Sequence, residues 1–361
     1  MKIAIVHDWL VINGGAEKVL KEIIELYPNA DIFSIVDFLD SNDRKDILSS
    51  KFSKTTFIQK LPFSKRYFRY YFPLFPIAIE SLDLSEYDLV ISSSWAVAKG
   101  IITTNKQIHI SYYQARNMKY IWDESDLYFT GIKRIFKPFF INYLRKFDIK
   151  SSKNADYIIT NSKFVQDWVK DKYNRKSEVI YPPVDISRFT LNEEKQNYYL
   201  TVARLVSYKR VDLIVKAFNQ MKDKKLIVVG DGDEFTSIMN IANENITMLG
   251  FLKGEELTNK IENAKAFVYC GVEDFGISPI EAIACGTPVI ALNQGGTAET
   301  VIDGLNGIHF ENQKIDDIIN AVHKFENTNF DAVKIRNSSI KYTLFKQEFK
   351  NFVTNAISSK D

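Results

Sequence analysis

The segment 273–291 combines two carboxylates with the start of a short helix. Glu273 lies in the loop before this helix, which we expect to begin at Ser278, with Glu281 in its first turn. The free N–H groups and positive dipole end of a helix N-terminus favour an anion. The segment is therefore suited to hold a phosphate while its carboxylates accept hydrogen bonds from sugar hydroxyls. A purely structural alternative is that Ser278 and Glu281 form a capping box.

Cations and glycines follow the expected strands elsewhere in the chain. Arg204 and Lys209 come after the expected strand 198–203, and Gly14 and Gly15 come after the first expected strand. Arg offers a fork to two phosphate oxygens and Lys a mobile point charge, so this pair can neutralise a departing diphosphate. The glycines let a ligand approach the backbone at a helix N-terminus. Solvated cations and a plain glycine turn are the alternatives.

A third motif, Gly-Asp-Gly-Asp at 230–233, follows an apolar run. An Asp-x-Asp in such a place can hold a divalent cation against a diphosphate. This one lies deep in the second half, after a complete set of alternating elements, so we expect no metal site here. A dinucleotide-binding Gly-x-Gly-x-x-Gly is absent from the chain, which disfavours NAD enzymes and nucleotide-sugar epimerases.

Each half of the chain alternates apolar runs with amphipathic stretches. Strands are expected at 3–7, 89–92, 108–111, 157–160, 198–203, 226–229, 247–249, 266–269, 289–292 and 308–310, and helices at 16–26, 211–221, 255–263 and 315–325. Alternating strands and helices form parallel doubly wound sheets, with ligands beyond the carboxyl ends of the strands. The chain is thus predicted to be α/β, with two Rossmann-like domains.

The paired prolines at 182–183 open the expected boundary between these domains. We predict an N-terminal domain over 1–185 and a C-terminal domain over 196–340. The last segment, 341–361, is expected to form a helix that packs back on the N-terminal domain.

Composition predicts a soluble globular protein in a reducing compartment. Of the 361 residues, 45% are hydrophobic and 25% are charged, as in ordinary globular proteins. The sequence lacks an apolar run long enough to span a membrane, and its start lacks the pattern of a signal peptide. Its two cysteines cannot form a disulfide framework or a spaced metal motif. We therefore expect a cytoplasmic protein.

Charge differs between the two halves. Residues 1–195 carry 29 Lys and Arg against 24 Asp and Glu, whereas residues 196–340 carry 14 against 19. The stretches 60–72 and 133–153 combine cations with aromatic residues. Such stretches suit single-stranded nucleic acid or an anionic membrane surface, and a plain amphipathic helix packed on its own sheet is the remaining alternative. We favour peripheral membrane contact over nucleic acid.

Several motifs together resemble one enzyme family over nearly the whole chain. These are Glu-x7-Glu with Phe-Gly-Ile between, Arg-x4-Lys at 204–209, His-Asp-Trp-Leu with Gly-Gly-Ala-Glu-Lys near the start, Leu-Val-Ile-Ser-Ser-Ser near 89–94, Tyr-Ile-Trp-Asp at 120–123 and Tyr-Pro-Pro-Val-Asp at 181–185. They resemble retaining glycosyltransferases of family four, of the GT-B fold, and in particular the subgroup that contains O-antigen mannosyltransferases. The resemblance implies two domains facing a central cleft.

The resemblance also implies roles for the residues above. Glu273 would contact the donor sugar and Glu281 the ribose hydroxyls, while Arg204 and Lys209 stabilise the leaving diphosphate. The catalytic residues would then be Arg204, Lys209 and Glu273, and the donor-binding residues Gly14, Gly15, Gly230, Phe275, Gly276, Ile277, Glu281 and Glu299. Transfer would proceed with retention, without a metal or other cofactor.

The resemblance to the mannosyltransferase subgroup implies GDP-mannose as the first candidate for the donor, and a UDP-sugar is the alternative. The acceptor would be a polysaccharide or a lipid-linked oligosaccharide, met at the cytoplasmic face of the inner membrane. Two segments depart from the family: Trp95 stands where members often have His, and 114–117 reads Gln-Ala-Arg-Asn where they often have a His-Thr-Pro-like run. Both belong to the acceptor side, so a shifted acceptor specificity is an open alternative.

Overall fold

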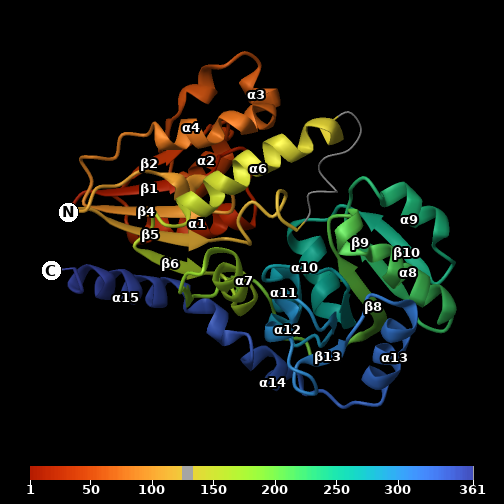
Figure 1. The fold of residues 1–361 in the computed structure, drawn as a ribbon. Helices are drawn as coiled ribbons and strands as arrows, with labels where there is room; N and C mark the ends of the chain where they lie inside the picture. The colour runs from red at the N-terminus through yellow and green to blue at the C-terminus, as the bar shows by residue number, and fades with distance from the viewer. Residues whose placement is uncertain (124–132, 361) are drawn as a thin grey trace. The chain divides into compact units, whose positions relative to one another are not determined.

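A computed structural model describes residues 1–123 and 133–360 of the chain (Figure 1). It divides into two compact units, of which the first comprises 1–183 with 344–361 and the second 184–343. Each unit contains one sheet in which every pair of neighbouring strands is parallel. The prediction of two parallel α/β sheets is therefore confirmed.

The first unit has seven strands in the order β3-β2-β1-β4-β5-β6-β7. Their bounds are β1 Ile3–His7, β2 Asp31–Ser34, β3 Lys54–Thr55, β4 Leu89–Ser94, β5 Ile108–Tyr113, β6 Tyr157–Thr160 and β7 Glu178–Val179. The central strands β4 and β5 are buried throughout, as expected of a parallel sheet covered on both faces. Strands β2, β3 and β7 were not predicted from the sequence, because they are short, and they lie toward the two edges of the sheet.

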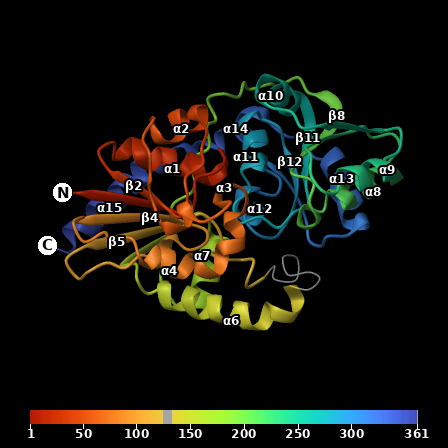
Figure 2. The same ribbon diagram turned by 90° about the horizontal axis from the view of Figure 1, so that it is seen from above.

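Helices cover both faces of this sheet (Figure 2). The bounds are α1 Gly15–Leu26, α2 Ser41–Leu48, α3 Ser64–Tyr67, α4 Phe75–Glu80, α6 Lys133–Ser151, α7 Lys163–Tyr173 and α15 Phe345–Ser358, with the 3-10 helices η1 Phe57–Lys60, η2 Phe68–Leu74 and η3 Ala98–Gly100. Helices α1, α2 and α15 contribute to the apolar core on one face, and η2, α4 and α6 to that on the other. Phe345 and Phe349 of α15 pack edge-on against Tyr112 of β5, so the C-terminal helix belongs to this unit.

The basic and aromatic stretch 60–72 is not one amphipathic helix. It is divided among η1, α3 and η2, because Phe63 takes a left-handed backbone conformation (φ 54°) and Tyr67 departs from helical geometry. Phe68 points into the core, whereas Phe63, Tyr67 and Tyr70 are exposed. The reading as a plain packed helix is therefore wrong for this stretch.

The second unit has six strands in the order β10-β9-β8-β11-β12-β13. Its strands are β8 Gln196–Val202, β9 Leu226–Val229, β10 Ile246–Gly250, β11 Ala264–Tyr269, β12 Val289–Leu292 and β13 Gly307–Phe310, and its helices are η4 Ser207–Lys209, α8 Val211–Gln220, α9 Phe235–Ile241, α10 Gly254–Asn263, α11 Ile277–Ala284, α12 Thr297–Thr300, α13 Ile315–Glu326, α14 Ala332–Asn337 and η5 Ile340–Thr343. Helices α8 and α13 contribute to the core on one face of the sheet, and α11 and α14 to that on the other. The order places β8 beside β11, so the loops after these strands open at the same edge.

Candidate functional site

A cluster of three polar side chains lies at this edge of the second unit. Lys209, at the end of η4, forms an ion pair with Glu273 in the loop after β11. Its Nζ also donates a hydrogen bond of 2.9 Å to the hydroxyl of Tyr269, the last residue of β11. The side chains of Lys209 and Glu273 are only 15% and 20% exposed. Two of the predicted catalytic residues are thus in direct contact.

Backbone packing explains why these residues meet. A Cβ on Gly271 would lie 3.2 Å from Cα of Lys209, so the loop after β11 passes directly against η4. Arg204 follows β8 as predicted and is exposed, and within residues 1–123 and 133–360 its guanidinium makes no hydrogen bond or ion pair. The two predicted cations therefore differ, since Lys209 is neutralised by a carboxylate and Arg204 remains available to an anion.

The start of α11 differs from the prediction. The helix begins at Ile277, with Gly276 as its N-cap at φ 88°, and no side chain caps it. Ser278 and Glu281 therefore do not form the capping box, and Glu281 lies beyond the first turn. The physical reason is that the left-handed conformation at Gly276, which glycine adopts readily, turns the chain into the helix before Ser278 is reached.

Glu281 is instead paired with Arg188, a residue that the sequence analysis did not identify. Arg188 belongs to the segment leading into β8, and its guanidinium lies 4.5 Å from the ring centroid of Phe189. The pair joins residues 93 positions apart, and its cation is 41% exposed. A ligand that bound Glu281 through hydroxyl groups would have to share this carboxylate with Arg188.

The loop after β12 packs against the loop that contains Glu273. The N–H of Gly296 donates a 2.7 Å hydrogen bond to the carbonyl of Glu273, and Gly295 forms an isolated bridge with Glu273. Glu299, one of the predicted donor-binding residues, lies in the first turn of α12. Phe275 is buried against Tyr342, at 5.5 Å between ring centroids. The backbone on both sides of Glu273 is therefore held in place.

The Gly-Asp-Gly-Asp motif forms a tight loop after β9. A Cβ on Gly230 would lie 1.8 Å from the carbonyl oxygen of Ala203, so only glycine permits this approach. Asp231 uses a carboxylate oxygen to accept the N–H of Gly232 at 2.7 Å. Within residues 1–123 and 133–360, no group of three or more His, Cys, Asp or Glu side chains is arranged to hold a metal ion.

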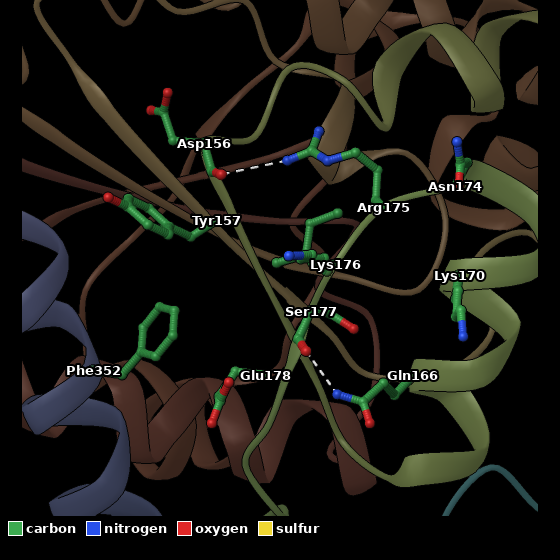
Figure 3. Close-up of a pocket in the computed structure, with 11 residues that line it drawn as sticks. Asp156, Tyr157, Gln166, Lys170, Asn174, Arg175, Lys176, Ser177, Glu178 and Phe352 are labelled. Atoms are coloured by element: carbon green, nitrogen blue, oxygen red, sulfur yellow. Dashed lines mark hydrogen bonds between the residues drawn. The ribbon is translucent and has the colours of Figure 1, made fainter.

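A cavity lies elsewhere, in the first unit. Its volume is about 850 Å³, and it opens at the amino ends of β6 and β7, between α7 and α15 (Figure 3). Gln166 and Arg175 in its wall are used to hold backbone, because they donate to the carbonyls of Ser177 and Asp156. None of the predicted site residues lines it. We place the candidate site at the strand ends of the second unit, where Lys209, Glu273 and Tyr269 meet.

In the first unit, Gly14 and Gly15 lie at the start of α1 as predicted. Gly14 is the N-cap and donates its N–H to Glu17 at 3.0 Å. Glu17 also lies 3.7 Å from Nε2 of His7, whose Nδ1 is 3.1 Å from the hydroxyl of Ser93. These buried polar groups sit at the carboxyl ends of β1 and β4 and fix the glycine loop.

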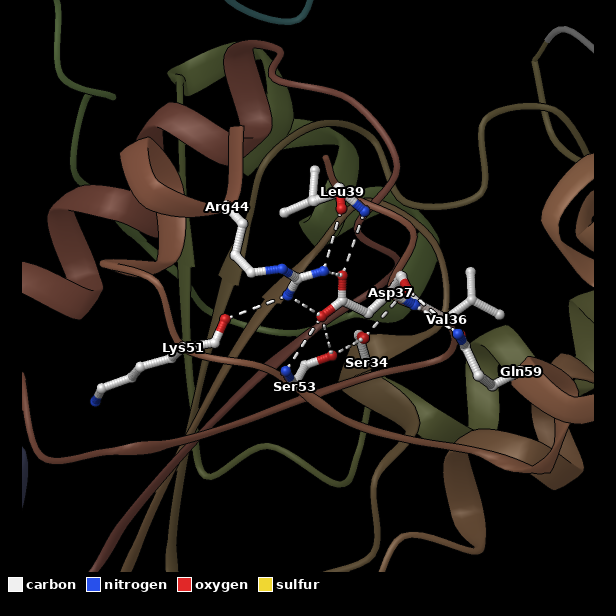
Figure 4. Close-up of polar contacts among 8 residues, drawn as sticks. All are labelled: Ser34, Val36, Asp37, Leu39, Arg44, Lys51, Ser53 and Gln59. Carbon is white, nitrogen blue, oxygen red and sulfur yellow. Dashed lines mark hydrogen bonds and ion pairs between the residues drawn. The ribbon is translucent and has the colours of Figure 1, made fainter. Parts of the chain in front are cut away.

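A buried ion pair stabilises the segment that follows β2, the strand next to β1 (Figure 4). Arg44 of α2 forms a two-pronged pair with Asp37, with distances of 2.7 and 2.8 Å. The segment that contains Asp37 pairs with the chain after β1, since the N–H of Phe38 donates to the carbonyl of Leu10 at 2.7 Å. The Asp37–Arg44 pair thus supports the loop that leads to Gly14.

Two parallel α/β units are the architecture of the GT-B class of glycosyltransferases, and cations and carboxylates lie at the strand ends of the second unit. Two family models match the chain in succession: "Glycosyltransferase Family 4" matches residues 13–188, and "Glycosyl transferases group 1" matches residues 184–343. The chain belongs to glycosyltransferase family 4, which confirms the family suggested by its motifs.

Named relatives and solved structures agree with this assignment. The O-antigen chain mannosyltransferase RfbU of Salmonella typhimurium is 28% identical over 207 residues, which cover 52% of this chain and 58% of that protein. A GDP-mannose-dependent alpha-(1-6)-phosphatidylinositol monomannoside mannosyltransferase of Mycolicibacterium smegmatis is 29% identical over 174 residues, or 40% of this chain and 46% of that protein. The crystal structure of Anabaena HepE with UDP-glucose has a TM-score of 0.69 at 16% identity, covering 98% of this chain and 100% of that one.

The chain spans about half the length of the curated relatives it matches. The likeness to HepE concerns the fold. Among the described helices, none has both the length and the apolar character needed to cross a membrane.

Proposed function

We propose that this protein is a retaining hexosyltransferase that moves a sugar, first of all mannose from GDP-mannose, onto a polysaccharide or lipid-linked oligosaccharide in cell-surface glycan synthesis. The observation that carries the proposal is the contact between Lys209 and Glu273 at the carboxyl ends of β8 and β11, and the exposed Arg204 also follows β8. Mannosyltransferases among the relatives support the sugar. The nucleotide-sugar bound by HepE supports the kind of donor and makes a UDP-sugar the alternative.

The chemistry assigned to these residues is electrostatic. Arg204 and Lys209 would neutralise the diphosphate as the bond between it and the anomeric carbon breaks, without a metal ion. The acceptor hydroxyl would bond to the same face of that carbon and pass its proton to the departing phosphate oxygen. Glu273 would hold the donor sugar, and Glu281 would turn from Arg188 to the ribose hydroxyls. Each carboxylate already has a cation beside it, which reduces its repulsion of the incoming diphosphate.

Ligand-induced stabilisation tests the donor assignment. A nucleoside diphosphate at 100 times its dissociation constant raises the free energy of unfolding by about 2.7 kcal/mol. We expect GDP and GDP-mannose to stabilise the protein more than UDP, ADP and their sugars. If UDP-sugars raise the free energy of unfolding more than GDP-mannose does, the donor is a UDP-sugar. If no nucleotide raises it, the proposed function is refuted. In the variant Glu273→Ala, transfer should be lost while GDP still binds, because this carboxylate is assigned to the sugar.

We also propose that the first unit meets its acceptor at an anionic membrane, at the cytoplasmic face of the inner membrane. Its exposed aromatic side chains include Phe63, which is 79% exposed, and Phe139 of α6, which is 75% exposed. Helix α6 packs against η2, with Phe72 and Phe140 at 6.1 Å between ring centroids, so the two sets lie on adjoining elements. We define the aromatic–basic face as Phe63, Tyr67, Tyr70, Phe139 and Tyr143 with Lys65, Arg66 and Arg69.

This composition suits the headgroup region of a bilayer. Aromatic side chains favour the membrane interface, and each cation near an anionic surface adds roughly 1 kcal/mol. Single-stranded nucleic acid, which also binds aromatic and cationic surfaces, is the competing partner. Salt-dependent binding to nucleic acid in the absence of any vesicle binding would favour that competitor.

A further inference from the structure

Tyr269 is the member of the strand-end cluster that no motif identified. It is only 4% exposed, and its ring stacks on that of Phe267 at 6.3 Å between centroids and 19° between planes. Packing therefore fixes the position of its hydroxyl. This hydroxyl accepts a hydrogen bond of 2.9 Å from Nζ of Lys209, and the same ammonium pairs with the carboxylate of Glu273, so the three groups adjoin one another.

The direction of these hydrogen bonds follows from the groups involved. An ammonium can only donate and an ionised carboxylate can only accept, so the phenol accepts from Lys209 and its own O–H can donate to the carboxylate of Glu273. Burial, together with the charge of Glu273, raises the pKa of Tyr269 well above its usual range. The phenol therefore keeps its proton at working pH and remains a donor.

The ion pair creates a conflict that the hydroxyl can resolve. Lys209 is bound to Glu273 in the chain as it stands, but a diphosphate would draw the same ammonium to itself. Without another donor, Glu273 would then be left in a largely buried place with its charge unbalanced, which is costly. The hydroxyl of Tyr269 lies within reach of both groups and does not have to move.

We propose that Tyr269 is a positioning residue that keeps Glu273 in place for the donor sugar when Lys209 turns from this carboxylate to the diphosphate. The inference rests on the proposed function and adds a residue to it. It predicts that the hydroxyl matters for both donor affinity and turnover, because it lowers the cost of separating Lys209 from Glu273.

The test compares Tyr269→Phe with a matched control, Tyr198→Phe. Tyr198 is also a buried tyrosine of this sheet, but its hydroxyl donates to the carbonyl of Lys260 at 2.8 Å, away from the cluster. We expect Tyr269→Phe to lower kcat about tenfold and to weaken GDP binding severalfold, as for a lost hydrogen bond to a charged group. Tyr198→Phe should leave both unchanged.

A second background separates positioning from packing. With Glu273→Gln the carboxylate no longer competes for Lys209, so adding Tyr269→Phe should change GDP affinity less than twofold in calorimetry. If wild type binds GDP but Tyr269→Phe matches it in affinity and kcat, the inference fails while the proposed function stands. An equal loss of GDP affinity in both backgrounds would reduce Tyr269 to a packing residue. If wild type binds no nucleoside diphosphate, the proposed function and the inference fail together.

Discussion

Asp8, directly after β1, is a buried carboxylate that organises the chain after β4. Its two oxygens accept four backbone hydrogen bonds, from the N–H groups of Trp95, Ala96, Val97 and Ala98, with lengths of 2.6, 2.8, 2.6 and 2.6 Å. Consecutive N–H groups around a carboxylate form an anion nest. The same turn presents Trp95, at which the chain departs from its family, so Asp8 fixes a position assigned to the acceptor side.

The substitution Asp8→Asn changes this nest with almost no change in volume. The amide keeps one oxygen, which can accept two of the four hydrogen bonds, and turns an NH₂ group toward the other two N–H groups. Two buried donors are then unsatisfied, and each costs about 1–3 kcal/mol. We therefore expect the free energy of unfolding of the first unit to fall by about 4 kcal/mol.

Tryptophan fluorescence in urea measures this loss. All four tryptophans, at positions 9, 95, 122 and 168, lie in the first unit, so the signal reports that unit alone. The control is Asp40→Asn, because Asp40 accepts the N–H groups of Asn42 and Asp43 through a single oxygen, which Asn retains. This exposed cap should lose only a few tenths of a kcal/mol. Equal losses for the two variants would refute the reasoning.

Three other outcomes are expected. Arg204→Ala should lower turnover on the order of 10²-fold, as for a lost oxyanion-stabilising donor, while EDTA leaves the wild type active; metal-reversible inhibition would contradict this. At low salt the protein should sediment with anionic but not with neutral vesicles. Binding should weaken at high salt and in the variant Lys65→Glu/Arg66→Glu/Arg69→Glu. If the wild type does not bind anionic vesicles at low salt, the aromatic–basic face is not a membrane-binding surface. Burial lowers the pKa of His109 to about 4, below its unfolded value near 6.5, so the unfolded state binds more protons in between. The free energy of unfolding should fall by about 3 kcal/mol as the pH drops from 6.5 to 4, and His109→Gln should flatten this part of the urea-unfolding profile; an unchanged slope would show that another group titrates.

Local sequence was sufficient for much of the fold. The strands 157–160, 226–229 and 289–292 were predicted with the bounds that the structure has. An apolar run bounded by turn residues identifies a buried strand without knowledge of its neighbours. The alternation of such runs with amphipathic helices then implied parallel sheets, because parallel strands need a crossover between them. Edge strands such as β7 were missed, since two residues are too few to establish a pattern.

The motifs likewise indicated the family and the edge of the sheet where the site lies. Glu273, Arg204 and Lys209 were chosen from the Glu-x7-Glu and Arg-x4-Lys motifs, and their positions after apolar runs agreed with that choice, because ligands of doubly wound sheets bind beyond strand ends. The order of elements along the chain is enough to identify this edge of the sheet, and that order can be read from the sequence by itself.

Only the tertiary structure decided which of these groups touch. Lys209 meets Glu273, 64 residues away, because β8 and β11 are neighbours in the sheet. The tertiary structure also pairs Arg188 with Glu281 and brings the hydroxyl of Tyr269 to Lys209. The helix that contains Glu281 begins earlier than predicted because of the backbone conformation at Gly276. Strand order and backbone conformation are set by packing of the whole unit, so residues far apart in sequence become partners that no local pattern encodes.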